Sequence, residues 1–264
     1  MKYKVGFIGV GNMGGALLKT AVSTIGSNYV SFFDLSTEKV EEMIALTGAN
    51  SVSVYDLVKN SKYIFLGVKP NVISDVLEQI KDVIDSQSII VSMAAGVSIN
   101  EISRLSNTKR IIRIMPNTPS SIGEGVILYC VGDDIVDSDV EGFLEIMKDA
   151  GVVDKINENV IDAAAALSGC GPAFVYMFIE ALADGAVKCG LSRDKALLYA
   201  KQTVAGSALL SLKSDKHPGQ LKDEVCSPGG TTIEGVMSLE KGAFRHSVSN
   251  AVIAAYKKTS KLMK

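Results

Sequence analysis

The chain opens with Lys4-Val5-Gly6-Phe7-Ile8-Gly9-Val10-Gly11-Asn12-Met13-Gly14, an apolar run of strand length that ends in a glycine-rich turn. Apolar residues recur at helical spacing over residues 16–22, so the stretch predicts a strand, a tight turn and a helix. In such a turn the first glycine permits the bend, the second lets a pyrophosphate approach, and the third lets the helix pack on the strand. The helix start adds free amides and a positive dipole end. The predicted cofactor-binding residues here are Gly9, Gly11, Asn12, Met13 and Gly14.

A second β-rich run, residues 29–33, ends at Asp34, about twenty residues beyond the glycine turn. A carboxylate at this point accepts hydrogen bonds from an adenosine ribose and repels a 2′-phosphate, so Asp34 favours NADH over NADPH. Ser36, Thr37 and Lys39 follow at once and offer groups that hold a phosphate, which leaves NADPH open. Ser36 is also the predicted N-cap of the next helix.

Further apolar runs of strand length alternate with amphipathic helical patterns up to about residue 155. The predicted strands cover 63–68, 88–92, 110–115, 126–129 and 151–153, and helices are predicted over 72–84 and 138–148. This alternation predicts a Rossmann-type α/β domain, a parallel sheet with helices on both faces. Ligands of such sheets bind beyond the carboxyl ends of the strands. The loops there add the cofactor-binding candidates Val68, Lys69, Pro70, Ala94, Ala95, Gly96 and Asn117.

The pattern changes from Val160 onward, where Ala, Leu and Met dominate and almost no strand signal remains. We therefore predict two domains, a dinucleotide-binding domain over residues 1–158 and an all-α domain over 159–264.

Composition narrows the class of protein. The chain has 264 residues, 47% of them hydrophobic, and a formal net charge of −2, with no dense basic run for nucleic acid. We find no secretory signal and no apolar stretch long enough to cross a bilayer, so we expect a cytoplasmic protein without a membrane partner. The 4 cysteines are widely spaced and only 2 histidines are present, so we expect reduced thiols and no metal site.

A second glycine-rich segment, Ser227-Pro228-Gly229-Gly230-Thr231-Thr232, precedes another helical pattern. Successive amides at a helix start can bind a carboxylate, and the threonine hydroxyls add directed hydrogen bonds. A loop followed by a capped helix is the alternative interpretation of the same residues.

Several segments together resemble the 1-pyrroline-5-carboxylate reductase family. The strongest is His217 to Glu234, which looks like that family's signature almost without departure. The other matching segments follow in the family's order over nearly the whole chain: residues 7–14, 68–70, 94–97, 115–119 and 167–173.

The resemblance implies reduction of 1-pyrroline-5-carboxylate to L-proline with NADH or NADPH, the final step of proline biosynthesis. It implies a helical C-terminal domain that forms a homodimer with its partner, often assembled into a decamer. The substrate-binding residues that it implies are Gly230, Thr231 and Thr232, and we add Ser227, which we expect to shape the same loop.

Hydride transfer to a protonated C=N bond requires no strong general acid, so positioning dominates the catalysis. We assign the catalytic hydrogen bond to Thr232, whose hydroxyl the resemblance places near the ring nitrogen. The roles of Asp215, His217 and Glu224 stay open, because relatives differ at two of these positions and a structural role suits His217.

Three alternatives remain at this point. One is a related imine reductase, since a pocket for one carboxylate and one nitrogen discriminates ring size only through packing. Another is a β-hydroxyacid dehydrogenase, but that family places a catalytic lysine where this chain has Val175. A non-catalytic nucleotide sensor is the third, and it has no evident use for the segment from Pro218 to Glu234.

Overall fold

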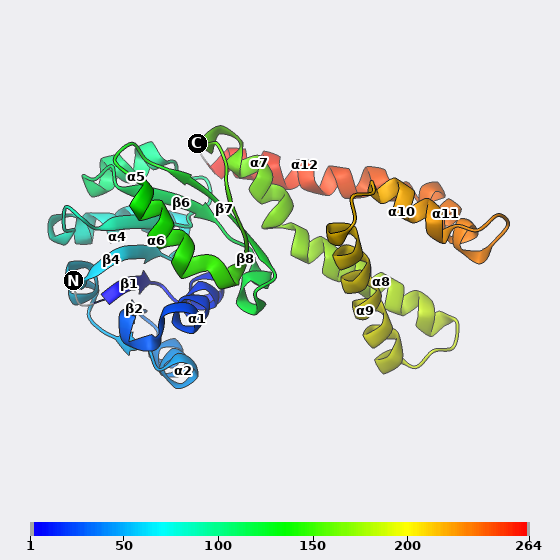
Figure 1. Cartoon of the computed structure of the whole chain (residues 1–264), viewed down its shortest axis with the longest axis horizontal. Helices are drawn as coiled ribbons and strands as arrows, with labels where there is room; N and C mark the ends of the chain where they lie inside the picture. Colours follow the sequence, from blue (N-terminus) through cyan, green and yellow to red (C-terminus); the bar gives the residue numbers. More distant parts are fainter. Residues whose placement is uncertain (1–2, 263–264) are drawn as a thin grey trace. The chain divides into compact units, whose positions relative to one another are not determined.

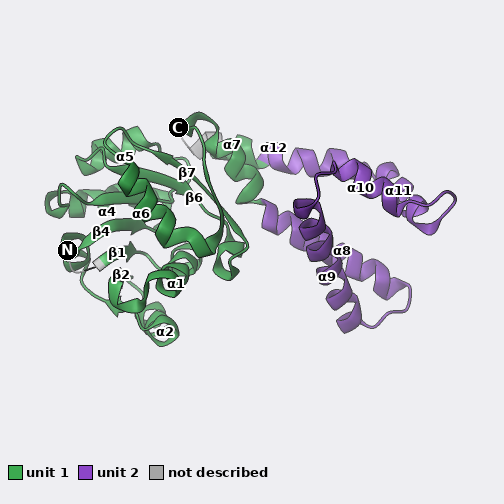
Figure 2. Cartoon of the chain, viewed as in Figure 1, with its two compact units in different colours: residues 1–170, 255–264 green, residues 171–254 purple. Residues whose placement is uncertain are grey.

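The computed structural model describes residues 3–262 of the chain. Contacts divide them into two compact units, shown in Figure 2. Unit 1 takes the described residues up to Cys170 together with those from Ala255 onward, and unit 2 is Gly171–Ala254. The division into compact units does not test the domain boundary that the sequence predicts between residues 158 and 159. That boundary stays a prediction.

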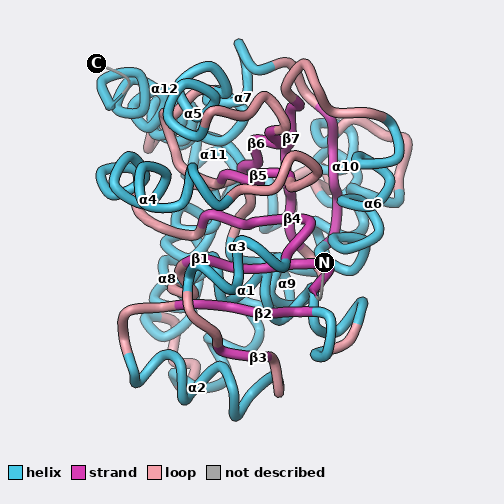
Figure 3. The backbone as a smooth tube through the Cα atoms, turned by 90° about the vertical axis from the view of Figure 1, so that its left-hand side faces the viewer, coloured by secondary structure: helices cyan, strands magenta, loops and turns pink. Residues whose placement is uncertain are grey.

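The described part of unit 1 is built on an 8-stranded sheet in the order β3-β2-β1-β4-β5-β6-β7-β8 (Figures 1 and 3). Its strands are β1 Tyr3–Ile8, β2 Val30–Phe33, β3 Asn50–Ser51, β4 Ser61–Leu66, β5 Ile89–Ser92, β6 Ile111–Met115, β7 Gly125–Val131 and β8 Gly151–Lys155. The strand order reverses between β1 and β4, which is where open α/β sheets bind dinucleotides.

One strand pair departs from the predicted parallel arrangement. β6 and β7 pair antiparallel, with Arg113 opposite Cys130, whereas the other pairs of this sheet are parallel. A parallel connection needs a crossover of about a dozen residues or more, and only residues 116–124 join these strands.

Helices cover both faces of the sheet. α1 Asn12–Ile25, α2 Thr37–Thr47 and α6 Asp137–Met147 share one core with Phe7, Phe65 and Ile112, in which the Phe7 and Phe65 rings stack with centroids 4.6 Å apart. α3 Val54–Asn60, α4 Ile73–Ile80 and α5 Ile99–Ser106 pack against the other face, through Ile64, Ile90 and Ile111. Short 3-10 turns connect these elements: η1 Ser27–Tyr29, η2 Pro70–Val72, η3 Lys81–Val83, η4 Thr118–Ile122 and η5 Lys148–Ala150.

α7 Glu158–Ser168 is the last helix of unit 1 before the division. Its Ile161 is buried in a small core with Met115, Leu128 and Cys130, which belong to β6 and β7. Met115 and Ile111 lie on the same face of β6 because they are four residues apart in a strand, so α7 covers the face that α5 also covers.

Unit 2 is helical. Its helices are α8 Gly171–Lys188, α9 Arg193–Lys213, α10 Pro218–Val225, α11 Thr231–Lys241 and the first part of α12 Phe244–Leu262. α8 and α9 meet through the small buried residues Ala183, Ala196 and Ala200. Large apolar side chains stay exposed, among them Met177 at 69%.

The expectation that no segment is long enough to cross a membrane was wrong, because one helical stretch has the necessary length and apolar composition. The helical stretch Glu158–Lys188 passes that test, although only 6% of its apolar window is buried in this single chain. Its apolar character comes from Ala, Leu, Val, Met and Phe side chains of α7 and α8. Many of those on α8 stay exposed among the described residues.

Candidate active site

The glycine turn after β1 is held by backbone contacts that leave no room for side chains at Gly9 and Gly14. Gly9 has φ +88°, a conformation that favours glycine, and its amide donates to the carbonyl oxygen of Phe33 at 2.8 Å. A Cβ on Gly14 would overlap the Gly9 carbonyl oxygen. α1 therefore starts closely against the turn, as a dinucleotide-binding turn requires.

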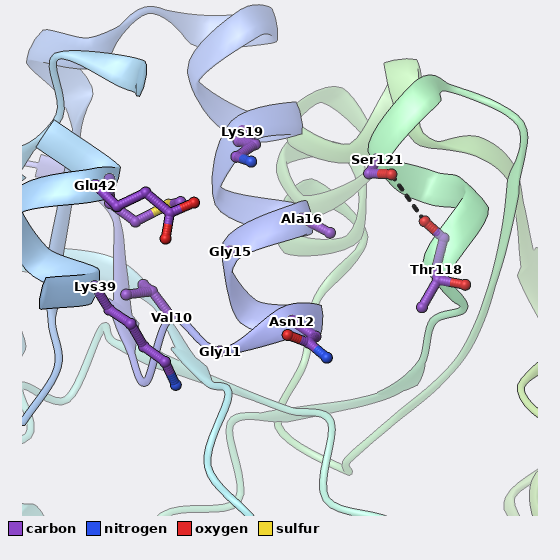
Figure 4. A pocket seen from close by; sticks show the side chains of 11 residues that line it. Val10, Gly11, Asn12, Gly15, Ala16, Lys19, Lys39, Glu42, Thr118 and Ser121 are labelled. Carbon is purple, nitrogen blue, oxygen red and sulfur yellow. Dashed lines mark hydrogen bonds between the residues drawn. The ribbon is translucent and has the colours of Figure 1, made fainter. Parts of the chain in front are cut away.

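The start of α1 is open to a ligand. Gly11 is its N-cap and offers no side chain, so the first amides of the helix have no side-chain partner there. A cleft lies along this end of α1, as Figure 4 shows, and its lining includes Asn12, Lys19, Lys39 and Thr118. A Cβ on Gly11 would meet only the Lys39 Nζ atom, at 3.8 Å, so an ammonium group stands beside the turn. Free amides and cationic groups in one cleft suit the phosphates of a dinucleotide.

Asp34 has a structural task beside its predicted one. Its Oδ2 accepts from the Val10 amide at 2.8 Å and its Oδ1 from the Ser36 amide at 2.9 Å. The carboxylate thus fastens β2 to the glycine turn. An ionised carboxylate has about four acceptor sites, so these two bonds leave capacity for ribose hydroxyls.

An apolar crevice beside Asp34 was missed from the sequence. Leu35, Val68, Val72 and Val76 line it together with Gly9 and Asp34, at the carboxyl ends of β1, β2 and β4. Such a slot, next to the ribose position, suits the flat face of an adenine ring. The sequence offered one indication of this crevice, because Leu35 is a large apolar residue in a loop. In the structure Leu35 is 91% exposed.

The predicted cofactor loops after β4, β5 and β6 all lie at the carboxyl edge of the sheet. Val68, Lys69 and Pro70 follow β4, with Lys69 as the N-cap of η2. Ala94, Ala95 and Gly96 follow β5, where Ala94 is buried and Gly96 has φ +74°. Structure and topology thus bring these loops to the edge where the glycine turn lies.

Asn117, after β6, uses its side chain inside the protein. Its Nδ2 donates to the Ser168 carbonyl oxygen at 3.0 Å, and its Oδ1 accepts from the Val126 amide at 2.8 Å. The residue is buried and joins the loop to the end of α7 and the start of β7. A direct side-chain contact with cofactor is therefore limited to what the second N–H of this amide can offer.

The second glycine segment lies in unit 2, between α10 and α11. Gly229 has φ +66° with open space around it, and the Gly230 amide donates to the Ser227 carbonyl oxygen at 3.0 Å. Gly230 is the N-cap of α11 and no side chain caps the helix, so the amides of its first turn have no side-chain partner. Thr231 is exposed and Thr232 is half-buried at this end. The geometry suits a carboxylate on the amides, with a hydroxyl next to it.

His217 and Glu224, whose roles the sequence left open, make contacts with nearby residues. His217 caps α10, because its Nδ1 accepts from the Gly219 amide at 3.1 Å. Glu224 pairs with Lys216 at 2.6 Å, and both side chains are about half exposed. These contacts favour structural tasks for His217 and Glu224, and no such contact links Asp215 to the loop among the interactions of the described residues.

Comparison with known proteins gives one consistent result. Residues 158–262 match the family model "Pyrroline-5-carboxylate reductase dimerisation", and residues 4–96 match "NADP oxidoreductase coenzyme F420-dependent". The pyrroline-5-carboxylate reductase of Pisum sativum is 39% identical over 98% of this chain and 96% of its own, and that of Escherichia coli K12 is 38% identical over 100% of both. The crystal structure of the Plasmodium falciparum pyrroline carboxylate reductase with NADP bound superposes with a TM-score of 0.91, at 35% identity over 100% of both chains.

Proposed function

The chain belongs to the pyrroline-5-carboxylate reductase family, and we propose that its two glycine segments divide the family's reaction between them. The reaction is the reduction of 1-pyrroline-5-carboxylate to L-proline with NAD(P)H. In the proposal the turn after β1 binds the cofactor and the loop before α11 binds the substrate.

The residues of unit 1 fit a dinucleotide. The amides at the start of α1 would hold the pyrophosphate, where Gly9, Gly11 and Gly14 keep side chains out of the way and Lys39 adds charge. Asp34 and the apolar crevice would hold the adenosine. Loops 68–70 and 94–96 would flank the nicotinamide half. When bound, the cofactor supplies a hydride for the C=N carbon.

The uncapped start of α11 is the observation that carries the substrate assignment. The amides of Gly230, Thr231 and Thr232 hold the substrate carboxylate, and Ser227 shapes the loop through the bond that its carbonyl accepts from Gly230. The Thr232 hydroxyl hydrogen-bonds the ring nitrogen and so orients the C=N carbon. Orientation of this kind is the main contribution that the protein makes to a hydride transfer.

We further propose a preference for NADH. The charge of Asp34 faces the position of a 2′-phosphate, and its two backbone bonds keep it there. Lys39 is the opposing influence, because its ammonium group beside Gly11 attracts phosphate.

We also propose that the enzyme works in the cytoplasm as a homodimer, with a decamer as the larger assembly. Support comes from the dimerisation model over residues 158–262 and from the exposed apolar side chains of α8 and α12. We also propose a domain boundary between residues 158 and 159, and the start of the same match at residue 158 supports it.

The test is the loss of reduced-nicotinamide absorbance with 1-pyrroline-5-carboxylate, run in parallel with NADH and NADPH. We expect turnover with both, a higher kcat/KM for NADH, and L-proline as the product. No turnover with either cofactor would contradict the proposed reductase activity and favour a nucleotide-sensing role. A six-membered cyclic imine carboxylate, used as a second substrate, measures how strictly the pocket selects ring size.

A further inference from the structure

A buried ionic cluster joins β6 to α7. The Arg113 Nη2 atom donates to the Asp162 Oδ1 atom at 2.6 Å, and the Nη1 atom donates to the Glu158 Oε1 atom at 3.2 Å. Arg113 is 1% exposed and Asp162 is also buried. The two acids lie four residues apart, so they face β6 from successive turns of α7.

The same cluster reaches the loop after β5. The Glu158 Oε1 atom accepts a second hydrogen bond, from the Ile99 amide at 2.7 Å. Ile99 begins α5, directly after the loop that contains Ala94, Ala95 and Gly96. One carboxylate therefore ties this loop segment, β6 and α7 together.

A second contact fastens the other end of α7. Ser168, its last residue, accepts the hydrogen bond from Asn117 in the loop after β6. α7 is thus attached near both ends to the two loops that follow β5 and β6.

We infer that Arg113 is a positioning residue of the reductase: with Glu158 and Asp162 it locks α7 onto β6 and so fixes the loops that flank the nicotinamide half of the cofactor. The inference rests on the proposed function for the role of those loops. None of the three side chains needs to touch substrate or cofactor.

Stability alone is a weak reason for such a cluster. Arg113 and Asp162 are removed from water at a cost in free energy, while the Glu158 side chain stays 33% exposed. Apolar residues of similar volume often stabilise a protein equally well. What a forked guanidinium adds is direction, because its donors fix the acceptors in a plane.

The chain supplies a matched control on the same strand segment. Arg110, just before β6, donates to the buried Asp139 of α6 at 2.7 Å. This pair lies at the amino end of β6, away from the predicted cofactor loops. It is also an arginine–aspartate pair with a buried acid, so its loss measures the general effect of such a pair.

The experiment compares Arg113→Lys with Arg110→Lys, and Asp162→Asn with Asp139→Asn. For each variant, kcat/KM is measured with 1-pyrroline-5-carboxylate, together with the kinetic isotope effect for NADH that carries deuterium in the transferred position. We expect Arg113→Lys to lower kcat/KM roughly 10- to 100-fold, the effect of a displacement of about 1 Å at a reacting centre. The isotope effect on kcat should rise above that of the wild type, because hydride transfer becomes slower than the other steps.

The controls should lower thermal stability to a similar extent while leaving the isotope effect and the KM for NADH unchanged. If the cluster served stability alone, its loss would lower only the fraction of folded enzyme. That fraction affects neither the isotope effect nor the KM for NADH. Equal isotope effects in Arg113→Lys, Asp162→Asn and their controls would overturn the inference. If Arg113→Lys does not fold, the two aspartate variants decide it.

A second readout does not depend on turnover, so it separates this inference from the proposed function. Cys130 pairs with Arg113 across β6 and β7 and is buried under α7. Alkylation of Cys130, followed by peptide mass spectrometry, should be faster in Arg113→Lys than in Arg110→Lys. Equal rates would show that the cluster does not hold α7 in place, whether or not the wild type reduces the imine.

Discussion

The two glycine segments of this chain differ in what surrounds them. At the turn after β1, a Cβ on Gly14 would overlap the Gly9 carbonyl oxygen, and a Cβ on Gly67 would overlap the same atom. At the loop before α11, a Cβ on Gly229 would have nothing within 4 Å, and one on Gly230 would come nearest to Ser227 of its own loop. The conformation of the first segment is fixed by close contacts with residues of α1 and of the loop after β4. The conformation of the second segment is fixed mainly by contacts within its own turn.

The two units repeat this contrast. Unit 1 buries large side chains such as Phe7, Phe65 and Phe143 around its sheet. The buried cluster of unit 2 consists of Ala183, Ala196 and Ala200. We infer that the cofactor site is complete within one chain, and that the substrate loop depends on a helical unit whose apolar surface needs a second copy to cover it.

The largest effect on cofactor binding should come from a side chain placed in the glycine turn after β1. Gly14→Ala places a methyl group against the Gly9 carbonyl oxygen, and relief of that contact must move α1 away from the turn. We expect NADH affinity to fall roughly 100-fold and stability to fall by about 1–3 kcal/mol, as for other overpacked sites. Fluorescence titration of NADH and thermal unfolding measure the two effects.

Gly11→Ala is the matched control in the same turn. Its new methyl group would meet only the flexible end of Lys39, so the melting temperature should stay near that of the wild type while NADH affinity falls. Wild-type NADH affinity in Gly14→Ala would show that the turn is not the cofactor site.

The next effect tests the dependence of unit 2 on a second copy. Met177→Glu puts a charge on the exposed apolar surface of α8, where burial against another chain would be costly. Self-association, measured by light scattering, should weaken, and turnover should fall roughly tenfold or more, as when an apolar anchor of an interface is lost. NADH affinity should change less than about twofold, because the proposed cofactor site lies in unit 1, away from the substituted residue in the chain's division into units.

Met177→Leu keeps the apolar surface and should behave like the wild type in both measurements. A Met177→Glu protein that still forms the wild-type assembly would place the interface elsewhere. Loss of NADH binding together with assembly would contradict the independence of unit 1.

A smaller effect concerns the choice of cofactor. Asp34→Ser removes the charge that we propose to face a 2′-phosphate, so the ratio of kcat/KM for NADPH to that for NADH should rise about tenfold. It also removes the acceptor of the Val10 amide, with an expected loss of about 1 kcal/mol in the free energy of unfolding.

Asp34→Asn separates the two tasks, because its amide oxygen can still accept from Val10 while the charge is gone. We expect the same shift toward NADPH with a smaller loss of stability. An unchanged cofactor ratio in both variants would leave Asp34 with the structural task alone.

Sequence patterns predicted the elements with strong periodicity or strong caps. The strands from β1 to β8 that carry apolar runs agree with their predicted segments, and unit 2 is helical, as its Ala, Leu and Met content predicts. Ser36 is the N-cap of α2, as expected, and its Oγ accepts from the Lys39 amide. The family resemblance, the fold class and the reaction were also available from residues alone.

Tertiary contacts account for what the sequence could not show. The short helices α3, α5 and α10 have too few turns for a clear periodic signal. The internal bonds of Asn117, and the cluster of Arg113 with Glu158 and Asp162, join residues that are far apart in the chain. The sequence indicates a cofactor ligand at Asp34, whereas its bond to Val10 becomes visible only when β2 is placed beside the turn.

In the proposed mechanism Thr232, at the start of α11, makes a hydrogen bond to the reacting C=N group, and the cofactor binds in the other unit. The most direct test is a single turnover, in which NADH bound to the wild type or to Thr232→Ala is mixed rapidly with 1-pyrroline-5-carboxylate. We expect equal NADH occupancy in the two proteins and decay of the nicotinamide signal roughly 10- to 100-fold slower in Thr232→Ala, the effect of losing one hydrogen bond to a charged group. Equal decay rates would remove Thr232 from the mechanism.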